Sequence, residues 1–159
     1  MNASAVRPIE DWFARHARAH RDPVNQAIQV IAAPALLWSM IALLWCIPVQ
    51  VDWLRSGVWA ALAMFAAWSF YNRLSRSIGF GMFVVFFFMA CVCRLVAQRA
   101  GLDALRWSAL GVFVPAWIAQ WGGHRIEGRK PGLSIDIMSL LIGPIWVLAG
   151  VYRKMGWRY

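Results

Sequence analysis

Charged side chains are scarce in this sequence. Of its 159 residues, 14% are charged and 61% are hydrophobic, whereas a typical globular chain is about a quarter charged and about half apolar. This balance excludes an ordinary soluble domain and indicates an integral membrane protein. The length suits one domain, so we expect residues 1–159 to form a single membrane unit.

Acidic residues are scarcer still, since seven Asp and Glu stand against sixteen Lys and Arg. The resulting charge of +9 does not indicate nucleic-acid binding, because the cations lie at the ends of apolar runs, where they meet lipid headgroups. A nucleic-acid interface would need them together on one soluble face. We therefore expect membrane lipid as a partner and no nucleic acid.

Cysteine is also rare, and the chain does not begin with an apolar core. Cys46, Cys91 and Cys93 lie inside apolar runs, which argues against a disulfide framework or a cysteine-rich zinc site. The first 26 residues carry three acidic residues and four Arg, so we expect no cleavable signal peptide. No apolar run has an ionisable residue near its middle, which disfavours a transporter.

Long apolar runs are what the sequence has instead. The stretch from Pro23 to Val51 carries no charge and exceeds the roughly 20 residues that cross a bilayer core. We predict an all-α, multi-pass membrane protein with about five transmembrane helices and a short interfacial amphipathic helix before them. The interfacial helix is predicted at 8–21, and the spans at 27–47, 57–71, 78–97, 105–122 and 135–152.

The three histidines are the main candidates for chemistry. His16 and His20 are four residues apart, so on a helix they share a face and could reach one metal ion. Four predicted spans separate His20 from His124, which puts both on the same side of the membrane. Imidazoles with an oxygen ligand suit Fe(II), Zn or Mn. The alternative is a solvated interfacial face that holds no metal.

Other polar residues accompany these histidines. Glu127 could supply an oxygen ligand or orient a histidine. Arg129 and Lys130 could hold the carboxylate of a lipid substrate, although cations in this position most often anchor a chain to headgroups. Asn25 and Gln29, one helical turn apart, either belong to the site or only cap a helix and bind a backbone carbonyl.

Several motifs are specific enough to compare with known families. They are His20-Arg-Asp-Pro-Val-Asn25, the later Pro34, Gln120-Trp-Gly-Gly-His124, Ile126-Glu-Gly-Arg-Lys-Pro131 and Leu140-Leu-Ile-Gly-Pro-Ile-Trp146. From about residue 9 to the C-terminus, the sequence resembles the Mpo1-like membrane family, especially its short bacterial members. The characterised fungal branch is an Fe(II)-dependent dioxygenase that shortens 2-hydroxy long-chain fatty acids by one carbon.

The resemblance implies the same reaction here, with Fe(II), O₂ and a long-chain 2-hydroxy fatty acid, in a multi-pass protein of the bacterial inner membrane. It implies His20 and His124 as metal ligands, with Asn25 and Glu127 close by. A second copy of the chain, in a homo-oligomer, is a further candidate partner.

One position departs from the family pattern. Gln29 stands where the family has a histidine, and a neutral amide is a weak metal ligand. His16, one helical turn from His20, is the candidate replacement. We count Glu127, Asn25 and Gln29 as candidate catalytic residues. The other interpretation, with Zn or no metal at the site, is a non-catalytic lipid-binding or scaffold protein.

Overall fold

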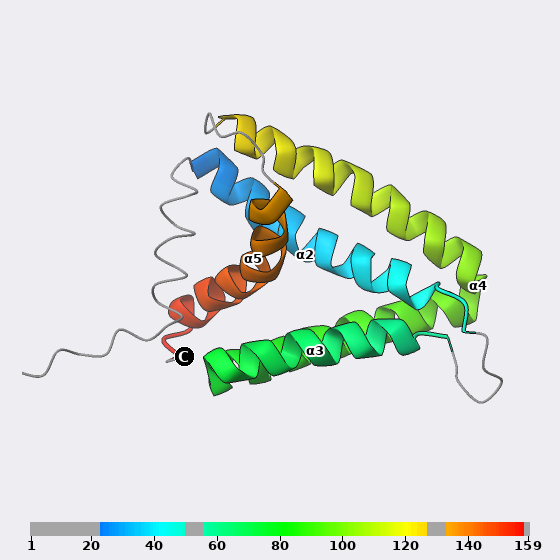
Figure 1. Ribbon diagram of the computed structural model, residues 1–159. Coiled ribbons are helices and arrows are strands. Elements are labelled where there is room, and N and C mark those ends of the chain that lie inside the picture. Colours follow the sequence, from blue (N-terminus) through cyan, green and yellow to red (C-terminus); the bar gives the residue numbers. More distant parts are fainter. Residues whose placement is uncertain (1–22, 50–55, 127–132, 158–159) are drawn as a thin grey trace, which may run out of the picture.

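The computed structural model describes residues 23–49, 56–126 and 133–157. Within these ranges the chain is helical apart from short turns and contains no strand, which confirms the all-α class. The helices are α2 (Pro23–Trp45), α3 (Val58–Leu74), α4 (Arg76–Ile126) and α5 (Leu133–Lys154), arranged as in Figure 1. The predicted interfacial helix at 8–21 lies outside the described residues.

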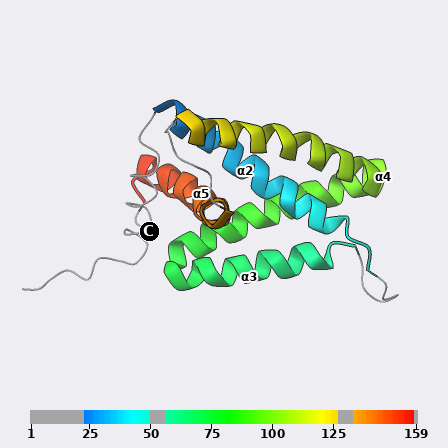
Figure 2. The same cartoon turned by 45° about the horizontal axis from the view of Figure 1, so that its top comes forward.

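α4 consists of two helices joined at a sharp break, so the element folds back on itself. Gly101 has φ of 90° and ψ of 167°, a conformation that essentially only glycine adopts. The first half of α4, residues 76–100, runs along α3, and the second half, residues 102–126, returns along α2 (Figures 1 and 2). The break therefore separates the apolar runs predicted at 78–97 and 105–122.

The core lies where α2 crosses the other helices. Its largest fully buried hydrophobic side chains are Leu36, Tyr71, Ile78, Met82, Leu105 and Ile145. The hydroxyl of Tyr71 donates a hydrogen bond of 2.8 Å to the carbonyl of Leu141, and the hydroxyl of Tyr152 donates one of 3.1 Å to the carbonyl of Ser77. These bonds satisfy hydroxyl groups that would be costly to bury unpaired, and they tie α5 to α3 and to the start of α4.

Two described stretches are long and apolar enough to cross a membrane, Asn25–Trp45 and Arg76–Gly123, the second containing the break at Gly101. Only 39% and 22% of their most apolar windows are buried, whereas the core helix of a soluble protein would be mostly buried. Within the described residues, α3 and α5 do not combine enough length with enough apolar character to pass the same comparison. The number of five spans therefore stays a prediction.

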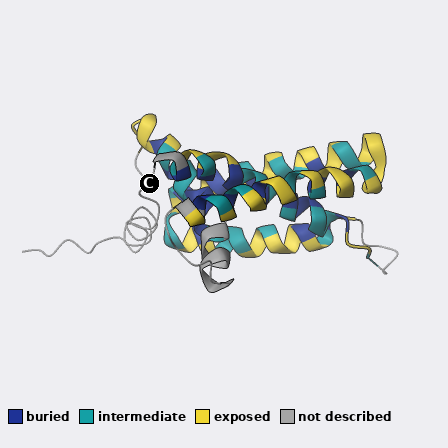
Figure 3. Cartoon of the chain, turned by 90° about the horizontal axis from the view of Figure 1, so that it is seen from above, coloured by how far each residue is buried: buried dark blue, intermediate teal, exposed yellow. Residues whose placement is uncertain are grey.

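Large apolar side chains cover much of the outer surface. Figure 3 shows exposed residues along the outer sides of the helices and buried ones where the helices meet. The most exposed, at 65–75% of their surface, are Ile31, Phe80, Phe88 and Trp107. Large apolar side chains exposed in such number favour membrane association.

Candidate functional site

α2 and the second half of α4 pack against each other in opposite directions, and we call their contact the α2–α4 seam. Successive contacts lie one helical turn further along α2 and one turn earlier along α4. They join Asn25 to Gly123 and Gln29 to Gln120, and beyond these Ala32 and Leu36 form a buried cluster with Ala116. The seam is therefore polar at one end and apolar beyond it.

Three buried amide side chains form the polar end of this seam. Asn25 and Gln29 are almost completely buried, and Gln120 is only 8% exposed. The Nε2 of Gln120 donates a hydrogen bond of 3.1 Å to the Oε1 of Gln29. The Nε2 of Gln29 has no hydrogen-bond partner among the described residues. Because an unsatisfied buried donor costs about 1–3 kcal/mol, this atom marks a place where a polar group of a ligand or of a neighbouring segment belongs.

Gly123 makes the close approach of the two helices at this end. A Cβ at this position would overlap the Oδ1 and Cγ of Asn25, so any larger residue would push the helices apart. The preceding Gly122, by contrast, has nothing within 4 Å of its Cβ position in the described part of the chain. The Asn25–Gly123 contact therefore holds the start of α2 against the last turn of α4.

The outer side of the same turn carries a cation. The guanidinium carbon of Arg125 lies 4.0 Å from the ring centroid of Trp121, and both residues are exposed. This cation–π contact suits an interface where an aromatic ring meets water. The buried amides and the exposed cation thus occupy different sides of one helix end.

The structure brings together part of the predicted site. Asn25 and Gln29 lie buried at the polar end, and the backbone of His124 follows directly after Gly123 in α4. The remaining candidates lie outside the described residues; they are His16, His20, Glu127, Arg129 and Lys130. Within the described residues, no group of three or more His, Cys, Asp or Glu could hold a metal ion. The predicted metal set therefore stays a prediction.

Sequence reasoning assigned no role to Gln120 or Gly123. A signal for Gln120 was present, because it is the first polar side chain after Ser108 in an apolar run and precedes His124 by one helical turn. Gly123 gave no such signal. Its importance comes from the Asn25 side chain, which belongs to another helix.

The family comparison agrees with these motifs. A family model described as 2-hydroxy-palmitic acid dioxygenase Mpo1-like matches residues 6–155. The chain belongs to the Mpo1-like family. No curated protein and no solved structure shows a significant match. The Mpo1-like match confirms the family expected from the sequence, and it includes the whole α2–α4 seam as well as all three histidines.

Proposed function

We propose that this Mpo1-like protein is an Fe(II)-dependent dioxygenase that shortens 2-hydroxy long-chain fatty acids by one carbon. The family description supports the reaction class. The observation that carries the proposal for this chain is the contact between Asn25 and Gly123. In sequence, Asn25 is five residues after His20 and Gly123 is the residue before His124. The contact therefore supports a site to which both ends of the chain contribute.

The residue types near this contact suit Fe(II). Imidazole and carboxylate groups are the ligands of non-haem Fe(II) oxygenases, and the metal, when bound, supplies the activation of O₂. We assign the metal to His16, His20, His124 and Glu127. We do not assign it to Gln29, because its Oε1 already accepts a hydrogen bond from Gln120.

The amide pair Gln29–Gln120 is proposed to bind and orient the substrate head group. The hydrogen bond from Gln120 fixes the amide of Gln29, so the direction of its remaining donor, Nε2, is set before a ligand arrives. That donor can bind a carboxylate or hydroxyl oxygen of the substrate. Arg129 and Lys130 are proposed to offset the charge of the carboxylate.

The reaction balances with one O₂ for each substrate molecule. The bond between the carboxyl carbon and the hydroxyl-bearing carbon breaks, and the hydroxyl-bearing carbon is oxidised to a carboxylic acid. The former carboxyl carbon leaves as CO₂, O₂ is the oxidant, and one water molecule forms. No other reductant or co-reactant is needed.

We further propose that the protein is a multi-pass protein of the bacterial inner membrane. The five spans would be α2, α3, the two halves of α4, and α5, with the interfacial helix before them. The two apolar stretches and the exposed apolar surface support this arrangement. A fatty acid could then reach the α2–α4 seam from within the bilayer.

The direct test uses purified protein with Fe(II), O₂ and 2-hydroxypalmitic acid. We expect pentadecanoic acid as the product, and we expect His20→Ala and His124→Ala to lose both bound iron and product. His16→Ala tests the replacement of the family histidine, and its iron content should fall as well. Stoichiometric iron without any turnover would overturn the dioxygenase assignment.

A non-catalytic lipid-binding or scaffold protein is the second candidate. Gln29 favours it, because a buried amide hydrogen-bonded to Gln120 stands where the family has a histidine. Metal analysis separates the two candidates. Substoichiometric iron that does not change in His20→Ala or His124→Ala would favour the scaffold.

A further inference from the structure

An apolar groove continues from the polar end of the α2–α4 seam. It is a pocket of about 410 Å³ between α2 and the second half of α4. Apolar side chains line it, four of them alanines. Its lining includes Ile28, Ala32 and Ala35 from α2, and Pro115, Ala116 and Ala119 from α4.

One end of the groove lies next to the buried amides along both helices, although neither amide side chain lines it. Ile28 directly precedes Gln29 in α2, and Ala119 directly precedes Gln120 in α4, so both walls start beside the amide pair. From there the walls continue toward the apolar part of the seam. A polar end followed by an apolar groove matches a molecule that has a polar head and a long hydrocarbon tail.

The walls combine a buried floor with an exposed rim. Ala32 and Ala116 are at most 8% exposed, whereas Ile31, which also lines the groove, is 75% exposed. The small floor residues leave the space that makes the groove. Because the rim is apolar and open to the outer surface, a hydrocarbon chain could enter sideways from a lipid phase.

The length of the groove suits most of one acyl chain. Each wall covers seven helical steps, 28–35 on α2 and 112–119 on α4, which is about 10 Å at the rise of an α-helix. Since two chains end to end make a bilayer core of about 30 Å, one chain in a fluid bilayer spans roughly 15 Å. The tail of a long chain would therefore pass the end of the groove near Ala35.

We propose that this groove binds the acyl tail of the substrate and that a long tail leaves its open end past Ala35. The identity of the head group rests on the proposed function, whereas the position of the tail rests on the groove itself. With the head at Gln29 and Gln120, the first carbons of the tail lie against Ala32 and Ala116.

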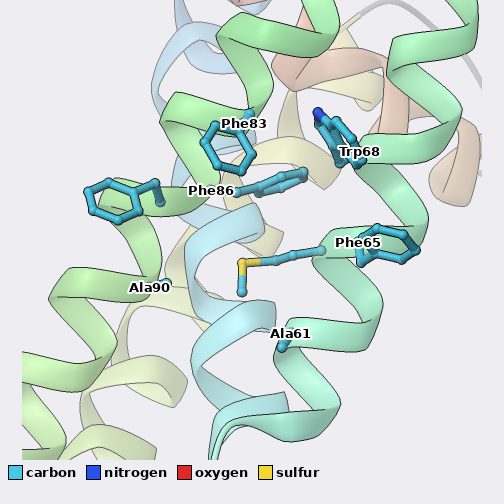
Figure 4. A pocket seen from close by; sticks show the side chains of 8 residues that line it. Ala61, Phe65, Trp68, Phe83, Phe86 and Ala90 are labelled. Carbon is cyan, nitrogen blue, oxygen red and sulfur yellow. The ribbon is translucent and has the colours of Figure 1, made fainter.

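A second apolar groove provides a matched comparison. It has a volume of about 340 Å³ and lies between α3 and the first half of α4, where Trp68 lies close to Phe83 and Phe86 (Figure 4). All its lining residues belong to those two segments, so none is next to the buried amides. Apolar character alone therefore does not distinguish the two grooves, but the position of Ile28 and Ala119 next to the buried amides does.

Photo-crosslinking locates the tail in the unmodified protein. The probe is 2-hydroxypalmitic acid with a diazirine near the middle of its chain, irradiated with the protein in lipid nanodiscs and mapped by mass spectrometry. We expect labelling within residues 28–35 and 112–119, and we expect excess 2-hydroxypalmitic acid to prevent it. Labelling concentrated between residues 61 and 90, or spread over the helices and not prevented by the competitor, would overturn the assignment.

The chain-length profile gives a second test. Ala35→Phe fills the far end of the groove, so turnover of the longest 2-hydroxy acids should fall about tenfold relative to shorter ones, as overpacking of an apolar site predicts. Ala90→Phe is the control, since Ala90 is a half-buried alanine of the second groove, and its profile should match the unmodified protein. An unshifted profile in Ala35→Phe overturns the proposal.

These outcomes separate the groove from the reaction. Labelling of the groove by the probe without turnover of any 2-hydroxy acid would reject the proposed reaction and support the groove as a lipid site. Turnover of 2-hydroxy acids with labelling outside the groove would support the proposed reaction and reject the groove as the site of the tail. Because crosslinking uses the natural chain, the test does not depend on whether Ala35→Phe folds.

Discussion

Gly123 and Gln120 determine how the start of α2 meets the end of α4. Gly123 leaves the space that the Asn25 side chain occupies, and Gln120 supplies a donor to the buried oxygen of Gln29. Each effect comes from one local contact between the two helices. Substitutions here should therefore disturb the polar end while the rest of the helix packing persists.

Replacing Gly123 by Ala should force the two helix ends apart. The added Cβ would overlap Asn25, and overpacking of this kind typically costs about 1–3 kcal/mol. We expect a lower thermal midpoint in detergent and, on the proposed function, a loss of bound iron. The matched control is Gly122→Ala, where helix propensity should raise stability by about 0.5–1 kcal/mol. Equal behaviour of the two variants would contradict the close contact.

Replacing Gln120 by Leu should be costlier alone than together with Gln29→Leu. The single change leaves the oxygen of Gln29 buried without its donor, which costs about 1–3 kcal/mol in free energy of unfolding. The double variant removes both polar groups, so much of that loss should return. A double-mutant cycle measured by denaturant unfolding gives the coupling. If the losses in free energy of unfolding of the two single variants add up to that of the double variant, the hydrogen bond contributes nothing to stability.

At the scale of whole elements, the sequence predicted helices well because apolar runs set their extent. The runs at 57–71 and 135–152 correspond to α3 (Val58–Leu74) and α5 (Leu133–Lys154), each a few residues longer than predicted. The predicted spans 78–97 and 105–122 leave residues 98–104 between them, and only Gly101 leaves the helical conformation there. The polar residues around it stay helical, and Asp103 pairs with Arg106 at 3.3 Å within the helix.

The reversal of α4 depends on the backbone of Gly101. In the described part of the chain, nothing lies within 4 Å of its Cβ position, so only conformation opposes a side chain there. We expect Gly101→Ala to lower the free energy of unfolding by about 1–3 kcal/mol. Gly111→Ala is the control, because Gly111 also has open space around its Cβ position but lies in helical geometry. Thermal unfolding of both variants checks the prediction, and Gly111→Ala should be neutral or stabilising.

The candidate site was only partly predictable. Counting spans predicts that His20 and His124 lie on one side of the membrane, and this stays a prediction because His20 lies outside the described residues. The contact of Asn25 with Gly123 could not be predicted by counting spans. The pairing of Gln29 with Gln120 could not be predicted, because it depends on how each helix is rotated about its own axis. That rotation results from packing between segments 91 positions apart, which periodicity within one helix does not specify.

At the scale of the whole molecule, the exposed apolar surface decides how the protein meets its surroundings. Cys91 lies on this surface in the first half of α4, whereas Cys46 and Cys93 are buried. The cysteines therefore report on different environments within one chain. If lipid covers the outer surface, the exposed thiol should behave as though it were protected.

Cys91 should resist a charged, membrane-impermeant maleimide in intact membranes and react after denaturation in SDS. The charged reagent cannot enter the hydrocarbon that would cover this thiol. The control is Asp103→Cys, since the side chain of Asp103 is 83% exposed beside the break in α4. That variant should be labelled from one side of the membrane. Rapid labelling of Cys91 in sealed vesicles would contradict a lipid-covered surface.

The hydrogen bond between Gln29 and Gln120 joins segments made at different times during synthesis, since 91 positions separate them. At ribosomal rates of about 5–20 residues per second, Gln29 waits roughly 5 to 18 s for its donor. During that interval the nascent chain carries an unmatched amide in an apolar helix. The polar end of the seam therefore cannot form until the second half of α4 has been made.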